Sequence, residues 1–235
     1  KVKRGVSLRL KIDLHVHSAY SDGRGDVEEI LRTARLRGLD GLAITDHGTL
    51  GGYREALSIE SGLLILPGYE VETDAGHVLV LGLERLPPRA LWMRYERLVG
   101  WVGDQGGLSV LAHPAAGRFR SGRWYLTRPD AVEVFNASYP SDHFVRRGRR
   151  LADVLGLPAV GGSDAHHHLM VGDAYTVVEV DEPVVHEVLE AIRSGSTGFE
   201  GSLSPLLYRC RTGISYLIGK LAEKLKHRTR ALTVI

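Results

Sequence analysis

The sequence predicts an α/β fold in which parallel strands form a barrel surrounded by helices. Three observations support this expectation. First, strand-like and helix-like segments alternate along the 235-residue chain, which has the length of one α/β barrel. Second, the strand-like segments are nearly continuous apolar runs, as expected for parallel strands covered on both faces. Third, histidine and aspartate collect where these runs end, and barrels carry their functional residues at the carboxyl ends of their strands.

The elements follow one another in a regular order. The strand-like runs are Leu8–His17, Leu39–Asp46, Leu63–Glu72, His77–Leu83, Leu108–Ala112, Ala131–Phe135, Ala159–Ser163 and Tyr175–Val180. The helix-like segments are Val27–Arg37, Gly52–Glu60, Ala90–Gln105, Ser141–Leu155 and Val184–Arg193. The first helix has the clearest ends, because Asp26 is a typical N-cap and Gly38 a typical C-terminal residue.

Composition excludes several protein classes. The apolar content of 43% and the charged content of 25% are ordinary for a globular protein. The apolar stretches are too short to cross a bilayer, and the basic opening has no signal-peptide core. Cys210 is the only cysteine, so no intrachain disulfide forms and a reducing, cytoplasmic location is expected.

Two biases stand out within this composition. The chain contains one asparagine and one glutamine, and arginine outnumbers lysine, a tendency of thermophilic proteins. From Gly201 onward, seven Lys/Arg against one acid give a net charge of +6, so the preceding residues carry about −4 of the total of +2. We therefore expect a barrel domain over 1–200 and a basic, amphipathic helical extension over 201–235 that packs on the barrel. Contact of this extension with nucleic acid is the alternative.

Short blocks of histidine and carboxylate close several of the apolar runs. The first block is Asp13-Leu-His15-Val-His17-Ser-Ala-Tyr-Ser-Asp22-Gly, and it is echoed by Thr45-Asp46-His47-Gly and Ser163-Asp164-Ala-His166. Imidazole and carboxylate are the usual ligands of borderline and hard divalent metals. One such block would mean little, whereas several at strand ends indicate a multinuclear metal centre and a hydrolytic enzyme.

In their order, these blocks together with Gly-Tyr-Glu70, His77 and Leu-Ala-His113-Pro resemble the polymerase and histidinol phosphatase (PHP) family. The resemblance runs from about Lys11 to His168. It implies a distorted (βα)7 TIM-like barrel, two or three divalent ions (Zn, Mn or Fe) at its mouth, and hydrolysis of phosphoesters.

The resemblance also implies a ligand set. His15, His17 and Asp164 would hold a first ion together with Glu70, which would bridge to a second ion held by His77 and His113. Asp22, His47 and His166 would hold a third. A hydroxide between the ions would attack phosphorus in line. We expect Glu70, Asp164 and His166 to be the catalytic residues.

Several neighbouring residues have expected roles of their own. Glu72 is the rival carboxylate for Glu70. Asp13 and Asp46 adjoin predicted ligands, and each could orient a ligand histidine by accepting the N–H of its other ring nitrogen. Arg118, with Arg120 beside it, and Arg24 are candidates for binding the substrate phosphate. His167 and His168 are expected at the solvent or substrate side, and His143 and His186 on the surface.

The substrate stays open between a small phosphomonoester, a nucleotide and a single-stranded nucleic-acid end. Only 35 residues separate His77 from His113, too few for a lid domain, so we expect an open mouth. A non-catalytic metal-binding or interaction module is an alternative to the enzyme, and so is an exonuclease. A lysine-bridged amidohydrolase is disfavoured, because no lysine lies between Lys11 and Lys220.

Overall fold

The computed structural model describes residues 7–92, 94–116 and 121–209, which form two five-stranded sheets and six α-helices. The strands are β1 (Leu8–Val16), β2 (Gly41–Ile44), β3 (Leu64–Leu66), β4 (Gly68–Thr73), β5 (Gly76–Leu81), β6 (Leu108–Leu111), β7 (Ala131–Asn136), β8 (Ala159–Gly162), β9 (Ala174–Val180) and β10 (Thr197–Gly201). The helices are α1 (Val27–Leu36), α2 (Gly51–Ser58), α3 (Tyr95–Asp104), α4 (Ser121–Leu126), α5 (Asp142–Leu155) and α6 (Val185–Ser194).

The sheets are mixed, which corrects the expectation of a parallel sheet. The strand orders are β10-β9-β1-β2-β3 and β4-β5-β6-β7-β8. β9 is antiparallel to both β1 and β10, and β5 is antiparallel to both β4 and β6. The reversal at β5 has a local cause: Thr73 pairs with Gly76 across a two-residue turn, and Gly76 takes a φ of +119° that glycine tolerates.

The two sheets are joined at the end of the molecule that carries the predicted ligands. There, His47 forms a parallel bridge with Glu70, and Val16 forms another with Ala165. Within the described residues, the strand ladders lie inside each sheet, and isolated bridges connect the two sheets. The structure therefore shows a mixed α/β fold, and the closed seven-stranded barrel stays a prediction.

The strands are covered on both sides by apolar side chains. In β5, Val78 and Val80 belong to one buried cluster, whereas Leu79 and Leu81 belong to another. We call these the outer and the inner cluster. The outer cluster joins the strands to α1, α2, α3 and α5, and the inner cluster lies between the sheets and includes side chains of α6. This alternation follows from the two-residue period of a strand.

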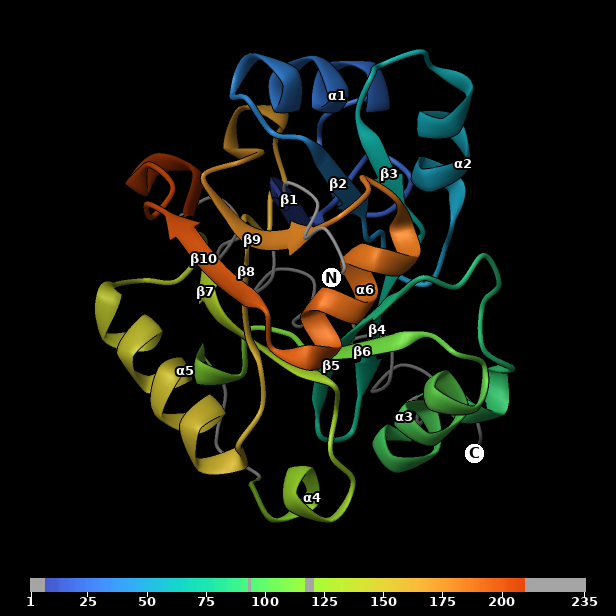
Figure 1. Cartoon of the computed structure of the whole chain (residues 1–235), viewed down its shortest axis with the longest axis vertical. Coiled ribbons are helices and arrows are strands. Elements are labelled where there is room, and N and C mark those ends of the chain that lie inside the picture. The colour runs from blue at the N-terminus through green and yellow to red at the C-terminus, as the bar shows by residue number, and fades with distance from the viewer. Residues whose placement is uncertain (1–6, 93, 117–120, 210–235) are drawn as a thin grey trace, which may run out of the picture.

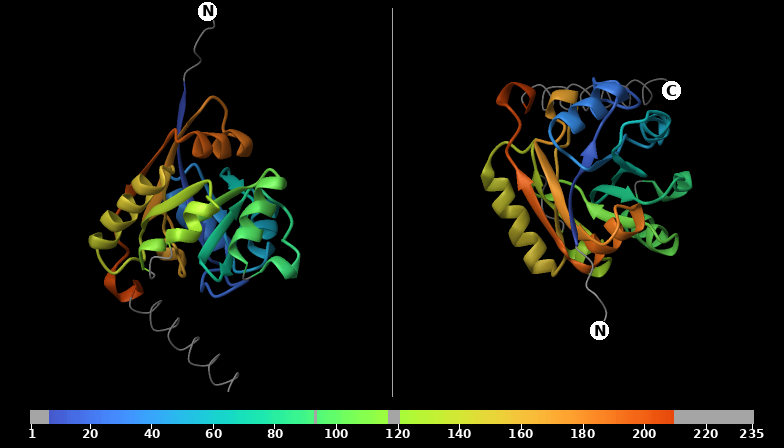
Figure 2. Two further views of the ribbon diagram at one scale, coloured as in Figure 1. Left: turned by 90° about the horizontal axis from the view of Figure 1, so that it is seen from below. Right: turned by 45° about the horizontal axis from the view of Figure 1, so that its top comes forward.

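Helices lie around the strands, with α5 on one side and α3 on the other (Figures 1 and 2). α1 begins as expected, because the Asp26 carboxylate accepts the Glu29 N–H at 2.8 Å, and Gly38 follows its end at a φ of +68°. α5 is followed by Gly156, which is also left-handed, with a φ of +60°. Among the described residues, no helix combines the length and the apolar character needed to cross a membrane.

Some predicted elements differ from the structure. The run Leu63–Glu72 is two strands, β3 and β4, because Pro67 lacks the N–H that a continuous strand would use. The predicted helix Ala90–Gln105 is a 3₁₀ turn over Arg89–Leu91 followed by α3. Helix α4 and strand β10 were not predicted.

The chain beyond β10 returns to the loops that follow β7 and β8. The Ser204 N–H donates to the Ala137 carbonyl at 2.9 Å, and the Ser204 hydroxyl donates to Asp173 at 2.7 Å. Arg209 donates to the carbonyls of Tyr139 and Pro140. The rest of the predicted 201–235 extension, with Cys210, lies outside the described residues.

Candidate metal centre

Two histidines reach the interior because β1 is irregular at its end. Leu10, Ile12 and Leu14 belong to the inner cluster, but Val16 belongs to the outer one. The pairing of β1 with β2 shifts register between Asp13 and Val16, and such a bulge changes which side chains share a face. His15 and His17 are therefore both buried, and their Nε2 atoms lie 3.1 Å apart.

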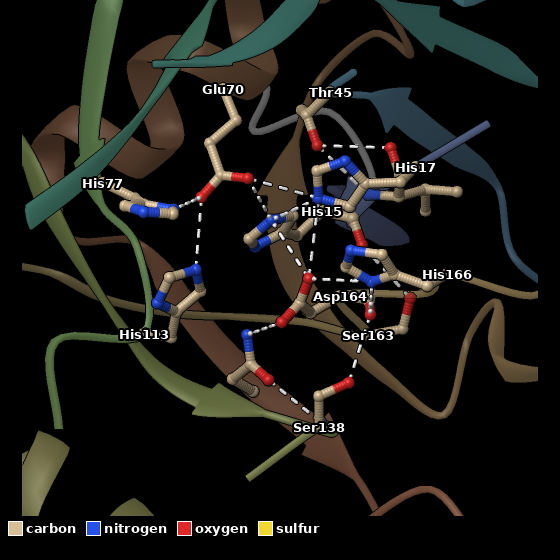
Figure 3. A network of polar contacts seen from close by, with 12 residues as sticks. His15, His17, Thr45, Glu70, His77, His113, Ser138, Ser163, Asp164 and His166 are labelled. Carbon is tan, nitrogen blue, oxygen red and sulfur yellow. Dashed lines mark hydrogen bonds and ion pairs between the residues drawn. The ribbon is translucent and has the colours of Figure 1, made fainter. Parts of the chain in front are cut away.

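Glu70 lies between two pairs of histidines (Figure 3). Its neighbours on β4, Tyr69 and Val71, belong to the outer cluster, so the carboxylate faces the interior. Glu70 Oε2 is 3.3 Å from His15 Nε2 and 3.2 Å from His17 Nε2. Glu70 Oε1 is 2.8 Å from His77 Nδ1 and 3.2 Å from His113 Nε2. Glu70 Oε2 is also 3.5 Å from His47 Nδ1, so the two oxygens face separate histidines, as expected of a carboxylate that would be shared between two ions.

Asp164 completes the group around the first pair. Its Oδ1 is 3.4 Å from His15 Nε2 and 3.5 Å from His17 Nε2. Asp164 has a φ of +52° and His113 a φ of +30°, and they are the only non-glycine residues of the described chain with positive φ. Strained backbone of this kind concentrates at functional sites. Here it places two predicted ligands.

A third group lies on the open side. Asp22 Oδ2 is 3.2 Å from His166 Nε2 and 3.6 Å from His47 Nε2. His17 also faces this group, because its Nδ1 is 3.5 Å from Asp22 Oδ1. The ring of His17 therefore lies between the first and third groups, a position that the sequence did not predict.

The donor atoms fit divalent ions. Four overlapping sets of ligand atoms each lie within 4.8 Å of one another: His15, His17 and Glu70; His15, His113 and Asp164; Glu70, His77 and His113; and His17, Asp22, His47 and His166. His17 Nδ1 is buried without a hydrogen-bond partner. Imidazole nitrogens that face one another and nearby carboxylates can share a divalent ion, and nitrogen with carboxylate oxygen suits Zn, Mn or Fe.

The electrostatics of the ion-free protein agree with a cation site. Burial alone would lower the pKa of His17, but Asp164 and Glu70 raise it to about 10. Burial alone would raise the pKa of Glu70, but the nearby histidines, His77 and His15 first, hold it well below its usual range. Without ions, protons therefore occupy the imidazoles between the carboxylates.

Glu133 on β7 is a buried carboxylate that the sequence reasoning missed. Its Oε1 accepts from His15 Nδ1 at 3.0 Å, and its Oε2 accepts from the His113 N–H at 2.7 Å and from Asn136 Nδ2 at 3.0 Å. Asn136, the single asparagine of the chain, also donates to Asp164 Oδ2 at 3.2 Å. The sequence Ala-Val-Glu133-Val-Phe-Asn136 could have indicated this residue, because the alternation of side chains along a strand places Glu133 on the interior face.

The structure corrects the roles expected of two aspartates. Asp13 accepts backbone N–H groups of Ser163 and Gly172, at 2.9 and 2.8 Å. Asp46 accepts from the N–H and hydroxyl of Ser18 and from the Ser21 hydroxyl, at 2.8, 2.6 and 2.6 Å. Neither hydrogen-bonds an imidazole in the structure. That role belongs to Glu133, while Asp46 holds the loop that carries Asp22.

The remaining predicted residues lie around this centre. The Arg24 side chain is exposed, and the Arg24 backbone N–H donates to the His166 carbonyl at 2.9 Å. Glu72 is exposed, and so are His143 and His186. His168 Nδ1 lies 3.1 Å from Glu29, and the His167 ring contacts Tyr208. Arg118 and Arg120 lie outside the described residues.

Two family models match the chain, one described as the PHP domain over residues 13–109 and one as PHP-associated over residues 143–197. An uncharacterized protein of Methanocaldococcus jannaschii is 32% identical over 143 residues, which cover 54% of this chain and 82% of the relative. A 3',5'-nucleoside bisphosphate phosphatase of Chromobacterium violaceum is 24% identical over 250 residues, covering 66% of this chain and 87% of that protein.

Solved structures show the same fold. A two-domain protein from Bacteroides vulgatus, containing a predicted PHP-like metal-dependent phosphoesterase, superposes with a TM-score of 0.71 at 19% identity. That match covers 86% of this chain and 68% of the other. The lesion-specific endonuclease Q of Pyrococcus furiosus gives a TM-score of 0.60 at 19% identity, covering 82% and 58%.

Proposed function

Because the chain belongs to the PHP family, we propose that it is a metal-dependent hydrolase of phosphate esters. The observation that carries the proposal is the position of Glu70. Its two carboxylate oxygens each face one pair of histidines, at 2.8 to 3.3 Å, and the side chain is buried. A buried carboxylate shared in this way suits a pair of ions and has no evident use in a purely structural core.

Bound divalent ions would supply a water of lowered pKa as nucleophile and neutralise charge on the phosphoryl oxygens. The protein's own residues prepare that chemistry. Glu133 accepts His15 Nδ1–H and thereby leaves His15 Nε2 free to bind. His166 Nδ1 lies 3.1 Å from the Asp164 carbonyl, which sets the same tautomer and leaves His166 Nε2 facing Asp22. We assign Glu70 and Asp164 to binding the ions and His166 to the substrate side, where it is part-exposed.

The substrate we propose is a phosphate ester of a nucleotide or of a nucleic-acid end. Two similarities support this class: the relative named as a nucleoside bisphosphate phosphatase, and the shared fold with an endonuclease. Arg24 supports phosphate binding, since its backbone is joined to His166 and its side chain is exposed. The basic residues after Gly201 are proposed to add contact with nucleic acid.

The test is metal analysis of the purified protein, followed by phosphate release from a panel of phosphomonoesters and oligonucleotides. His15→Ala should abolish release and lower the bound metal, whereas His186→Ala, a change at an exposed histidine, should do neither. Metal binding without hydrolysis of any ester would assign the chain to the non-catalytic modules. Equal release by wild type and His15→Ala would refute the proposed enzyme.

A further inference from the structure

Among the predicted ligands, Asp22 and His47 are the most exposed. The side chains of His15 and His17 are fully buried, and that of Glu70 is 1% exposed. Asp22 and His47 are 53% and 36% exposed. A substrate can therefore approach the centre past Asp22 and His47, where the side chains beside these two residues would meet the rest of it.

A tyrosine lies close to Asp22 in the sequence. Tyr20 precedes Asp22 by two residues, and its ring contacts Gly51, the first residue of α2. A Cβ on Gly51 would come within 2.2 Å of the ring, so only glycine permits this contact. Tyr20 is nevertheless 52% exposed, and its hydroxyl interacts with Glu55 of α2. One part of the ring is thus held by the protein while another faces solvent.

A tryptophan lies beside His47. The Trp92 ring contacts Gly48, the residue that follows His47, and a Cβ there would come within 2.5 Å of the ring. The Cα atoms of neighbouring residues are about 3.8 Å apart, so the indole contacts the residue next to the predicted ligand His47. Trp92 Nε1 donates to the Pro87 carbonyl at 3.0 Å, which fixes the ring, and the side chain is half-buried.

The two rings therefore flank the loop 47–51 beside the two most exposed predicted ligands. We propose that Tyr20 and Trp92 form a subsite for a nucleobase, whose phosphate lies at the metal centre. This inference rests on the proposed function and names its substrate class. Exposed aromatic rings stack on bases of any sequence, and no charged partner is required. Tyr20 is held by Gly51 and Glu55, and half of its surface stays in solvent, where it can meet a ligand.

The experiment measures binding, so that it does not depend on turnover. Calorimetry with the Mn²⁺-loaded protein compares two phosphonate analogues that cannot be hydrolysed, one of adenosine 5'-monophosphate and one of ribose 5-phosphate. The wild type should bind the nucleoside analogue more tightly. Tyr20→Ala and Trp92→Ala should each weaken that ligand roughly 5- to 100-fold and change the ribose analogue less than about twofold.

Matched variants separate stacking from support of the loop. Tyr20→Phe and Trp92→Phe keep an aromatic face and should retain most of the affinity. Tyr125→Ala removes an exposed aromatic ring from α4 and should leave both dissociation constants unchanged. The nucleoside analogue should also quench wild-type fluorescence, and Trp92→Phe should lose that quenching although Trp101 and Trp124 remain.

Equal wild-type affinity for the two analogues would overturn the subsite even if an alanine variant failed to fold. An equal loss for both ligands in the alanine variants would overturn it too, because the rings would then only support the metal ligands. A base preference without hydrolysis of any ester would instead refute the enzyme and keep the subsite. A 5'-phosphonate trinucleotide distinguishes the sources of the base: equal affinity assigns a free nucleotide, and tighter binding assigns a strand end.

Discussion

The most stringent test of the metal centre is the substitution Glu133→Gln. Glu133 offers two oxygens to three donors: His15 Nδ1–H at one oxygen, and the His113 N–H and Asn136 Nδ2–H at the other. Glutamine has one oxygen. If that oxygen takes the side with two donors, the new NH₂ faces His15 Nδ1. The imidazole must then carry its proton on Nε2, the atom that faces Glu70 and His17.

This change of tautomer removes one nitrogen from the first ligand group without removing a side chain. Loss of such a supporting hydrogen bond costs about 10- to 100-fold in metal affinity, or about 1.4 to 2.7 kcal/mol. The opposite amide orientation leaves two buried N–H groups unpaired, which is less favourable. We therefore expect weaker binding of one ion, with the other groups retained.

The assay is competition with a chelator of known affinity, combined with ¹⁵N NMR of the histidine rings. Glu179→Gln is the control, since Glu179 is an exposed residue of β9. Circular dichroism establishes that both variants fold. Wild-type affinity in Glu133→Gln, or a His15 that keeps its proton on Nδ1, would refute the reasoning.

Three further predictions concern the same centre. Asp46→Asn should release the loop held through Ser18 and Ser21 and reduce the bound metal by one ion, counted by mass spectrometry; loss of every ion would show that Asp46 supports the whole centre. Metal binding at pH 7 should release protons, because the pKa of His17 is raised to about 10 in the ion-free protein; calorimetry in two buffers of different ionisation enthalpy measures the release, and identical heats would contradict it. The same raised pKa of His17 adds to the free energy of unfolding of the ion-free protein. This contribution is fully present below the ordinary histidine pKa of 6.5 and is lost as pH rises through about 10. Chemical unfolding at pH 6.5 and 10 should show that loss, and a smaller one in His17→Gln.

Local signals in the sequence were enough for much of the fold. Asp26 and Gly38 mark the ends of α1 because capping is a property of a few neighbouring residues. The apolar runs locate most strands, because the apolar pattern of a strand is also set by a few neighbouring residues. The antiparallel course of β5 was not predicted, although Asp74-Ala75-Gly76 is a turn sequence, because a buried strand reads as apolar in either direction.

The candidate site was predictable where histidine and carboxylate close a strand. His15, His47 and Asp164 are such residues, and the structure brings them together. Glu133 was not found, because its partner His15 is 118 residues away along the chain. The roles of Asp13 and Asp46 were wrong for a related reason: each adjoins a predicted ligand in sequence, but its carboxylate hydrogen-bonds other groups.

The sequence by itself determined the kinds of ligand, their order and the strand ends that carry them, because these depend on residue type and local periodicity. Only the tertiary structure decided which nitrogen of each imidazole faces which carboxylate, and that the His17 ring lies between two ligand groups. It also placed the Trp92 ring on Gly48 and the Tyr20 ring on Gly51. These relations arise from the packing of distant segments against one another, and short sequence patterns do not record the distance or angle at which such segments meet.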